Sequence, residues 1–292
     1  MSEEAPDGRR EPEVPHSAGT SKPALKAPDG ACDSHLHIID PRFAPADDNR
    51  QRMTAGDYIL LQRRIGTTRA VVVQAKQYGV DNACLLDALR QLGANGRGVA
   101  VVGADVSDEE LERLHAGGVR GLRFSLWNPA ENVVSLDMMA RIAARIAPLG
   151  WHVQVHMMAD QIADAKPLLQ RLPCPLVIDH MGRLPPEEGE RHPAFKDMAD
   201  LLAAGNCWVK LAGAYLNTTE GPPHYADATR VAQALVRMAP ERLVWGSDWP
   251  HITEAHKPDD SRLFDLLLTW AGDEATRRAI LVDNPARLYQ FA

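Results

Sequence analysis

The sequence predicts a single (β/α)8 barrel, also called a TIM barrel. Short apolar runs alternate with helical stretches eight times between residues 29 and 292. Many of these runs are nearly continuous in Val, Ile and Leu, which is typical of parallel strands covered on both faces. A doubly wound open sheet is the alternative. No G-x-G-x-x-G turn follows the first run, however, and the repeat count of eight favours the barrel.

The predicted elements follow one another in order along the chain. Apolar runs place strands at 32–38, 69–75, 98–103, 119–124, 151–157, 175–179, 206–211 and 242–247. Segments with helical periodicity connect them at 55–65, 81–93, 107–116, 135–149, 160–171, 193–204, 225–239 and 259–271. A last helix is expected over 273–291, where Asn284 precedes a proline in "DNPARLY" and is interpreted as its cap.

Composition narrows the functional classes. The net charge of −7 argues against a basic surface for nucleic acid, and no apolar stretch reaches the roughly 18 residues of a membrane span. We therefore expect a small-molecule partner, with no nucleic-acid or membrane partner, and a monomer or small homo-oligomer. The cysteines are scattered and predict reduced thiols and a cytoplasmic location; they are Cys32, Cys84, Cys174 and Cys207.

Residues 1–28 differ in composition from residues 29–292. We expect residues 29–292 to form the catalytic domain. The first segment is rich in Pro, Glu, Ser and Gly and nearly free of large apolar residues. This composition predicts an arm that is disordered or lies on the surface. His16 lies in the arm and is not expected to be a ligand.

The first predicted strand, "DSHLHIID", carries two histidines one residue apart. Alternate side chains of a strand share a face, so Asp33, His35 and His37 are expected to point the same way. Active sites of barrels lie at the carboxyl ends of the strands. Ionisable or polar residues stand at nearly all of these ends, which predicts an active site there: Gln74, Lys76, Arg123, His156, Asp179, His180, Arg183, Lys210, Tyr215, Asp248 and His251.

Several motifs together resemble the amidohydrolase superfamily. They are "DSHLHIID", "VQVHMMAD", "VIDHMGR", "LVWGSDWPH" and "DNPARLY", and the resemblance covers roughly residues 28–291. Within the superfamily, the chain is similar to the branch of 2-pyrone-4,6-dicarboxylate hydrolase, sulfomuconolactone hydrolase and sugar-acid lactonases or lactone isomerases. The resemblance implies a hydrolase that opens a small, usually carboxylated lactone in aromatic or sugar-acid catabolism.

The resemblance also implies roles for individual residues. Asp248 matches the general base that activates water. His180 matches the sixth-strand histidine and is a candidate either for a metal ligand or for a catalytic acid; we favour the acid in a site with one metal. Arg123 and Arg183 match positions that bind a substrate carboxylate or the lactone carbonyl. By position alone, Lys76 and Tyr215 are further candidates for substrate binding, and His251 for holding Asp248 or its loop. Asp179 is expected to face away from the site.

One divalent metal ion is expected, zinc or manganese, with His35, His37, His156 and Asp248 as ligands. His156 corresponds to the fifth-strand ligand of metal-dependent superfamily members. Two metals are disfavoured because Arg123 and Ser125 stand where a bridging ligand would be needed. A mechanism without a metal is the alternative. In it Asp248 is the base, and His35, His37 and His180 donate hydrogen bonds to the lactone carbonyl.

The chain departs from the dicarboxylate hydrolase in "RFSLWNPAENVV", which has no second arginine after Arg123. We therefore expect 2-pyrone-4,6-dicarboxylate to be a poor substrate. A lactone isomerase and a metal-dependent decarboxylase of the same superfamily are alternatives to the lactone hydrolase. A non-catalytic binding protein is the least favoured interpretation.

Overall fold

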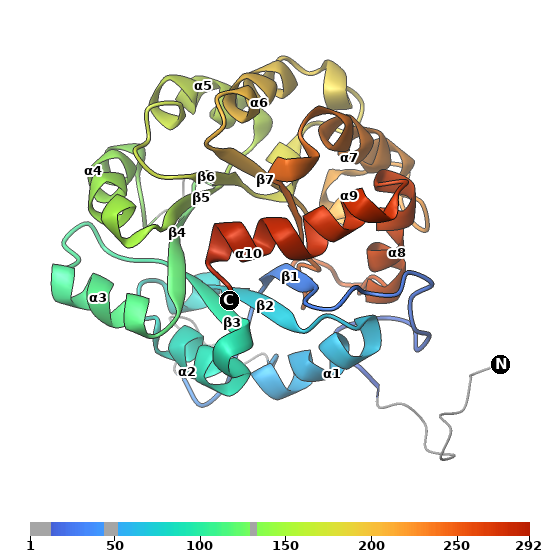
Figure 1. Cartoon of the computed structure of the whole chain (residues 1–292), viewed down its shortest axis with the longest axis horizontal. Coiled ribbons are helices and arrows are strands. Elements are labelled where there is room, and N and C mark those ends of the chain that lie inside the picture. Colours follow the sequence, from blue (N-terminus) through green and yellow to red (C-terminus); the bar gives the residue numbers. More distant parts are fainter. Residues whose placement is uncertain (1–12, 44–51, 129–132) are drawn as a thin grey trace.

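Eight parallel strands form one sheet in the order β1 to β8 in the computed structural model of the chain (Figure 1). The structure describes residues 13–43, 52–128 and 133–292. The strands are β1 Cys32–Leu36, β2 Arg69–Val73, β3 Gly96–Ala100, β4 Val119–Ser125, β5 His152–His156, β6 Leu176–Ile178, β7 Cys207–Leu211 and β8 Leu243–Trp245. The prediction of a (β/α)8 barrel is confirmed.

The barrel closes where β1 meets the segment that follows β8. Leu36 forms a parallel bridge with Trp249. The backbone N–H of Asp248 donates to the His35 carbonyl at 2.8 Å, and that of His37 donates to the Trp249 carbonyl at 2.9 Å. The closure therefore places the first-strand histidines beside Asp248.

The helices surround the sheet (Figure 1). They are α1 Ala55–Ile65, α2 Ala83–Leu92, α3 Asp108–Ala116, α4 Leu136–Ile146, α5 Ala159–Leu169, α6 Pro193–Ala203, α7 Ala226–Met238, α8 Asp260–Trp270, α9 Glu274–Arg278 and α10 Asn284–Tyr289. Local signals set their ends. In α1, for example, Thr54 and Asp57 form a capping box, and Gly66, with φ +82°, ends the helix in the left-handed conformation that glycine tolerates.

A small apolar cluster fills the barrel near the amino ends of the strands. Strand residues such as Val71, Val177 and Trp208 pack there with Leu288 and Tyr289 from α10. Figure 1 shows α10 lying across this end of the barrel. This end is therefore closed, and the opposite end is the one that can admit a ligand.

One expectation about the C-terminal segment is confirmed and one is wrong. The expected helix is present and runs from α9 through a π-helical turn, Ala279–Asp283, into α10. Asn284 does not cap α10. Its side-chain amide donates to the carbonyls of Pro240 and Leu243, each at 2.8 Å, and so ties the helix to the start of β8.

Residues 13–28 lie against the barrel. The Val14 side chain is buried, the Leu25 N–H donates to Asp265 at 2.8 Å, and the Trp249 indole donates to the Pro15 carbonyl at 2.8 Å. Residues 1–12 of the expected arm lie outside the described residues. No helix within the described ranges has both the length and the apolar content to cross a membrane.

Candidate active site

The residues predicted from the sequence gather at the open end of the barrel. Each lies in or soon after a strand: His35 and His37 (β1), Lys76 (β2), Arg123 (β4), His156 (β5), His180 and Arg183 (β6), Tyr215 (β7) and Asp248 (β8). All of them except His35 line one cavity of about 400 Å³. His35 is fully buried directly beneath it. The structure thus brings all nine residues together.

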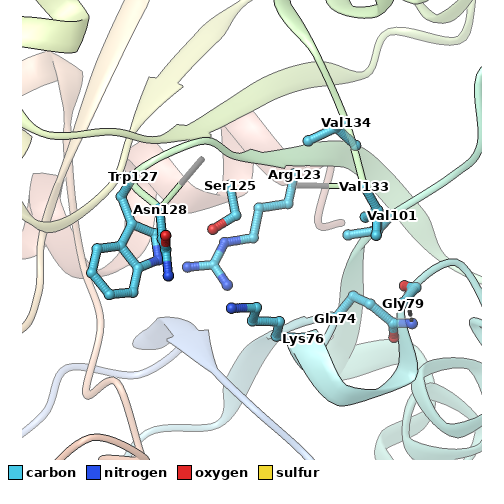
Figure 2. Close-up of a pocket in the computed structure, with 10 residues that line it drawn as sticks. All are labelled: Gln74, Lys76, Gly79, Val101, Arg123, Ser125, Trp127, Asn128, Val133 and Val134. Carbon is cyan, nitrogen blue, oxygen red and sulfur yellow. Dashed lines mark hydrogen bonds between the residues drawn. The ribbon is translucent and has the colours of Figure 1, made fainter. Parts of the chain in front are cut away.

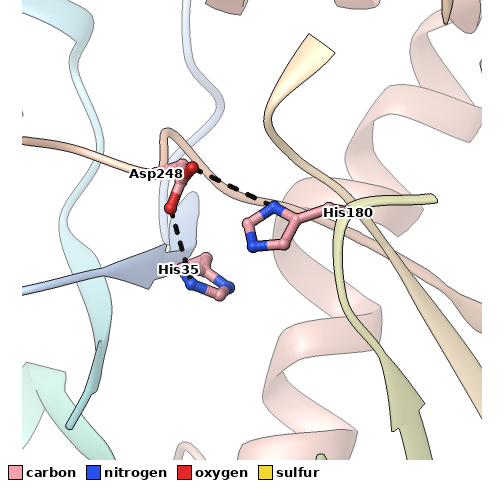
Figure 3. Close-up of side chains that lie close together, drawn as sticks. All are labelled: His35, His180 and Asp248. Carbon is pink, nitrogen blue, oxygen red and sulfur yellow. Dashed lines mark ion pairs between the residues drawn. The ribbon is translucent and has the colours of Figure 1, made fainter. Parts of the chain in front are cut away.

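The innermost contacts join His35, His37, His180 and Asp248. Nε2 of His35 lies 3.3 Å from Nε2 of His37 and 3.6 Å from Oδ1 of Asp248. Nε2 of His37 lies 3.8 Å from the same oxygen. His180 approaches from the other side, with Nδ1 4.0 Å from Oδ2 of Asp248. Figure 3 shows the Asp248 carboxylate between His35 and His180.

Burial keeps these histidines neutral. It lowers the pKa of His37 to about 4, and it lowers the pKa of His35, His156 and His180 below the ordinary value. Nδ1 of His37 lies 2.9 Å from the Val73 carbonyl, which can only accept, so Nδ1 carries the proton. The lone pair of His37 Nε2 therefore faces Asp248 and His35.

Asp248 is ionised at neutral pH. Burial alone would raise its pKa, but the polar groups around it, including the Tyr215 hydroxyl that donates to Oδ2 at 2.7 Å, lower the pKa below its ordinary value. Asp248 itself has φ +63°, a left-handed conformation that is uncommon for a non-glycine residue. The carboxylate is thus held in one orientation with a basic oxygen, Oδ1, directed at the histidine pair.

Asp179 does not face away from the site, and that expectation is wrong. Its Oδ1 lies 3.3 Å from Nδ1 of His35, and its Oδ2 lies 3.3 Å from Nε of Arg123. Strand alternation carries Asp179 inward together with Val177. The left-handed φ of +50° at His180 then turns the chain, so His180 also enters the barrel mouth instead of pointing outward.

His156 stands apart from the innermost group. Its Nδ1 lies 3.3 Å from both Arg123 Nη2 and Ser125 Oγ, and its ring is 5.1 Å from that of His180. Nε2 of His156 is buried and makes no hydrogen bond to any described residue. That nitrogen is available to a ligand, so a metal-binding role for His156 stays a prediction.

Positively charged side chains flank the cavity. Lys76 and Arg123 also line a smaller, adjoining cavity of about 100 Å³, together with Ser125 and Trp127. Figure 2 shows the Lys76 ammonium and the Arg123 guanidinium directed into the same space. Burial, and then the charge of Arg123, lower the pKa of Lys76. Arg183 lines only the main cavity, so all three cationic side chains border the main cavity.

The innermost donor atoms have the spacing of a metal site. Two ligands bound to zinc at about 2.0–2.1 Å with tetrahedral angles lie roughly 3.3–3.4 Å apart. The atoms Nε2 of His35, Nε2 of His37 and Oδ1 of Asp248 are separated by 3.3 to 3.8 Å. In addition, possible ligand atoms of His35, His180 and Asp248 all lie within 4.8 Å of one another. These residues therefore fit a divalent cation.

Sequence reasoning did not assign a role to the polar residues beneath the site. Lys210 in β7 is fully buried, with Nζ 3.3 Å from Nδ1 of His35 and 2.7 Å from Oε1 of Gln154. Asp260, the first residue of α8, contacts His251. A lysine in the apolar strand sequence "CWVKL" was a usable signal, because a central barrel strand is covered on both faces.

Fold and site together define a barrel enzyme with acid–base groups and possible metal ligands at its mouth. The chain belongs to the amidohydrolase family, whose family model matches residues 32–291. The confirmed family agrees with the motifs of strands one, six and eight.

Curated relatives cover nearly the whole chain. It is 34% identical to 2-pyrone-4,6-dicarboxylate hydrolase of Comamonas testosteroni, over 93% of this chain and 94% of the relative. It is 35% identical to 4-sulfomuconolactone hydrolase of Hydrogenophaga intermedia, over 90% and 89%. It is 30% identical to D-galactarolactone isomerase of Agrobacterium fabrum, over 91% and 92%.

Solved structures have the same fold. An apo crystal structure of an Agrobacterium tumefaciens protein superposes with a TM-score of 0.85 at 29% identity, over 95% of this chain and 99% of that one. A probable 2-pyrone-4,6-dicarboxylic acid hydrolase of Acinetobacter baumannii, with citric acid bound, has a TM-score of 0.80 at 25% identity, over 90% and 100%.

Proposed function

We propose that this protein hydrolyses a small carboxylated lactone at the mouth of its barrel. The observation that carries the proposal is that the two carboxylate oxygens of Asp248 have different surroundings. Its Oδ2 is held by Tyr215 at 2.7 Å, whereas Oδ1 faces the histidine pair and the cavity. An ionised carboxylate held in this way suits the role of a general base that takes a proton from water.

The proposed reaction needs only water and the lactone. The oxygen of water bonds to the lactone carbonyl carbon while Asp248 takes the proton, and the bond from that carbon to the ring oxygen then breaks. The proton leaves with the ring oxygen as a hydroxyl. His180 is the proposed acid, because its Nδ1 lies 4.0 Å from Oδ2 of Asp248 and can pass a proton towards the leaving oxygen.

A divalent ion, zinc or manganese, would polarise the lactone carbonyl and lower the pKa of water when held by His35, His37, His156 and Asp248. His37 is suited to such a role because its proton is fixed on Nδ1 and the lone pair of Nε2 faces the cavity. Without an ion, neutral histidines that carry a proton towards the cavity can donate to the carbonyl oxygen.

Arg123, Arg183 and Lys76 are the proposed binding groups for substrate carboxylates. Guanidinium groups pair with carboxylates through two parallel hydrogen bonds. The relative with bound citric acid, which carries three carboxyl groups, supports an acidic substrate. The curated relatives named as hydrolases of 2-pyrone-4,6-dicarboxylate and of 4-sulfomuconolactone support a hydrolase, and the role proposed for it is in aromatic or sugar-acid catabolism. Tyr215 is proposed to contact substrate as well, since it lines the cavity.

The buried, unpaired state of all four cysteines supports the proposal of a reducing, cytoplasmic compartment. We also propose that the protein works as a monomer or a small homo-oligomer. Neither point bears on the chemistry of the site.

A lactone isomerase is the second candidate, because one curated relative is D-galactarolactone isomerase. In that reaction a hydroxyl of the substrate would replace water, and no acid would be released. The experiment is a panel of aldonolactones and muconolactones, followed with a pH indicator and by separation of the products. Proton release with an open-chain acid supports hydrolysis, whereas a second lactone without proton release supports isomerisation. Failure of every lactone contradicts both.

A further inference from the structure

A chain of buried and partly buried hydrogen bonds leads away from Asp248 to the start of α8. The Tyr215 hydroxyl lies 2.7 Å from Oδ2 of Asp248 and 3.0 Å from Nδ1 of His251. Nε2 of His251 lies 3.1 Å from Oδ2 of Asp260. His251 and Asp260 are both fully buried. These two residues do not line the cavity described above.

The donors and acceptors of this chain can be assigned from chemistry. A carboxylate only accepts, so the single proton of Tyr215 is given to Asp248. The phenol oxygen can then only accept, and Nδ1 of His251 must donate to it. Nε2 of His251 contacts the carboxyl group of Asp260, so the imidazole joins the Tyr215 hydroxyl to the start of α8.

Other groups around His251 leave this assignment intact. The Lys257 ammonium donates to the His251 backbone carbonyl at 2.6 Å, and the Glu254 N–H donates to the same carbonyl at 3.0 Å, so these two bonds involve the backbone of His251 and not its ring nitrogens. Asp260 is the first residue of α8, where the amino end of the helix stabilises a negative charge. Its Oδ1 makes no hydrogen bond to any described residue.

The hydrogen bond from His251 to Tyr215 has a direct consequence for Asp248. A phenol that accepts a hydrogen bond from an imidazole N–H is a stronger donor, because hydrogen bonds in a chain polarise one another. Tyr215 therefore holds Oδ2 more firmly and leaves Oδ1 for the reaction. The loop is also held in an uncommon conformation, since Asp248 and His251 have φ of +63° and +57°.

We propose that His251 and Asp260 are positioning residues for Asp248 and act on it through Tyr215. The proposal rests on the proposed function, in which Asp248 is the base. It gives a role to two residues that touch neither the substrate cavity nor the reacting atoms.

The test is a double-mutant cycle on the lactone that the wild-type protein opens fastest. Tyr215→Phe and His251→Ala are each expected to lower kcat by about tenfold or more. The double variant is expected to be no slower than Tyr215→Phe alone, because His251 acts through the Tyr215 hydroxyl. Both single variants should move the acidic limb of the kcat/KM profile to higher pH, since Asp248 loses hydrogen bonding to its charged form.

If His251→Ala does not fold, two further variants test the same proposal: Asp260→Asn and His251→Asn. Asp260→Asn removes the negative charge and should lower kcat without raising KM in proportion. His251→Asn keeps a donor near the Nδ1 position and should recover part of the loss. Asp227→Asn is the matched control. Asp227 is a buried aspartate in the first turn of α7 that bonds to Thr218 and Thr219, and its loss should lower stability but leave the pH profile unchanged.

Additive losses in the cycle, or an unchanged acidic limb, would overturn the proposal. A second readout does not need a substrate: ¹⁵N NMR of His251 should show a proton on Nδ1, the nitrogen that faces Tyr215, and an unprotonated Nδ1 would also overturn it. Failure of the proposed function is separate. In that case Asp248→Asn retains activity or no lactone is opened, whatever the state of His251.

Discussion

Nζ of Lys210 lies 3.3 Å from Nδ1 of His35, inside the barrel where neither side chain reaches solvent. Oδ1 of Asp179 lies 3.3 Å from the same nitrogen. The ammonium can only donate and the carboxylate can only accept, so the two compete to set the position of the His35 proton. Burial lowers the pKa of Lys210 to about 8, which leaves it largely charged at neutral pH.

Either position of the His35 proton is compatible with the hydrogen-bonding groups around it. If Lys210 donates to Nδ1, the His35 proton lies on Nε2 and can be donated to Nε2 of His37 or to a carbonyl oxygen. If Asp179 accepts from Nδ1, Nε2 of His35 presents a lone pair beside that of His37. The second pattern is the carboxylate–histidine arrangement that supports metal binding.

The first prediction concerns Lys210→Met. Without the ammonium, Asp179 is the one that remains of these two competing groups. The proton of His35 then favours Nδ1, and Nε2 presents its lone pair. We expect zinc to bind about tenfold more tightly, since partners of ligating histidines change metal affinity by roughly 10- to 100-fold. Isothermal titration of metal-free protein with zinc at pH 7 measures this change.

Lys166→Met is the control for that change, because Lys166 pairs with Asp197 and Asp200 outside the site. It should leave zinc affinity unaltered. Weaker zinc binding by Lys210→Met, or no change, would show that Lys210 does not set the His35 proton.

The second prediction is that the protein loses stability in acid. Burial lowers the pKa of His37 to about 4, below its value in the unfolded chain, so the unfolded state binds more protons as the pH falls below about 6.5. The stabilisation from neutral His37 is thus complete above that pH and is lost towards pH 4. The expected loss from this residue is ~2 kcal/mol at pH 5 relative to pH 7.

Urea titrations at pH 7 and pH 5 measure that difference. His37→Asn should reduce the difference between the two pH values, whereas His224→Asn, at an exposed position, should not. Equal free energies of unfolding at pH 7 and pH 5 would contradict the burial of a neutral His37.

The third prediction is that Arg123→Met discriminates between substrates. Loss of a charged hydrogen bond costs about 1.5–3 kcal/mol. KM for carboxylated lactones should therefore rise about 10- to 100-fold more than KM for neutral lactones of the same ring size. Steady-state kinetics on matched pairs of lactones give the comparison.

Arg120→Met is the matched control from the same strand. Arg120 donates to the backbone carbonyls of His115 and Val119 and should not distinguish the two kinds of lactone. An equal loss on acidic and neutral lactones in Arg123→Met would point instead to its ion pair with Asp179. In wild type, 2-pyrone-4,6-dicarboxylate should be opened more slowly than a simpler carboxylated lactone. Lys76, beside Arg123, is the group that could overturn this expectation.

The barrel was predictable because its signals are local. The apolar runs predicted at 69–75 and 206–211 correspond to β2 and β7, and the helix predicted at 55–65 matches α1. Positions of the site residues followed from the same pattern, since the carboxyl ends of parallel strands meet at one end of a barrel.

Other features depend on backbone turns and distant contacts. The inward position of His180, next to an inward-facing Asp179, needed the left-handed conformation of His180, which strand alternation does not reveal. The partnership of His251 with Asp260 depends on how α8 packs against the loop after β8. Asn284 was assigned as a cap from its local sequence, but its partners are carbonyls more than forty residues away in sequence. Such contacts arise only when the chain is folded.

The most direct test of the account is Asp248→Asn, assayed on the lactone that the wild-type protein opens fastest. The substitution keeps the size of the side chain and can still accept from Tyr215, but it removes the basic oxygen that faces His35 and His37. We predict loss of hydrolysis with an unchanged circular dichroism spectrum. A folded variant that retains more than about a tenth of the wild-type kcat, equivalent to less than about 1.4 kcal/mol of transition-state stabilisation, would show that another group takes the proton from water.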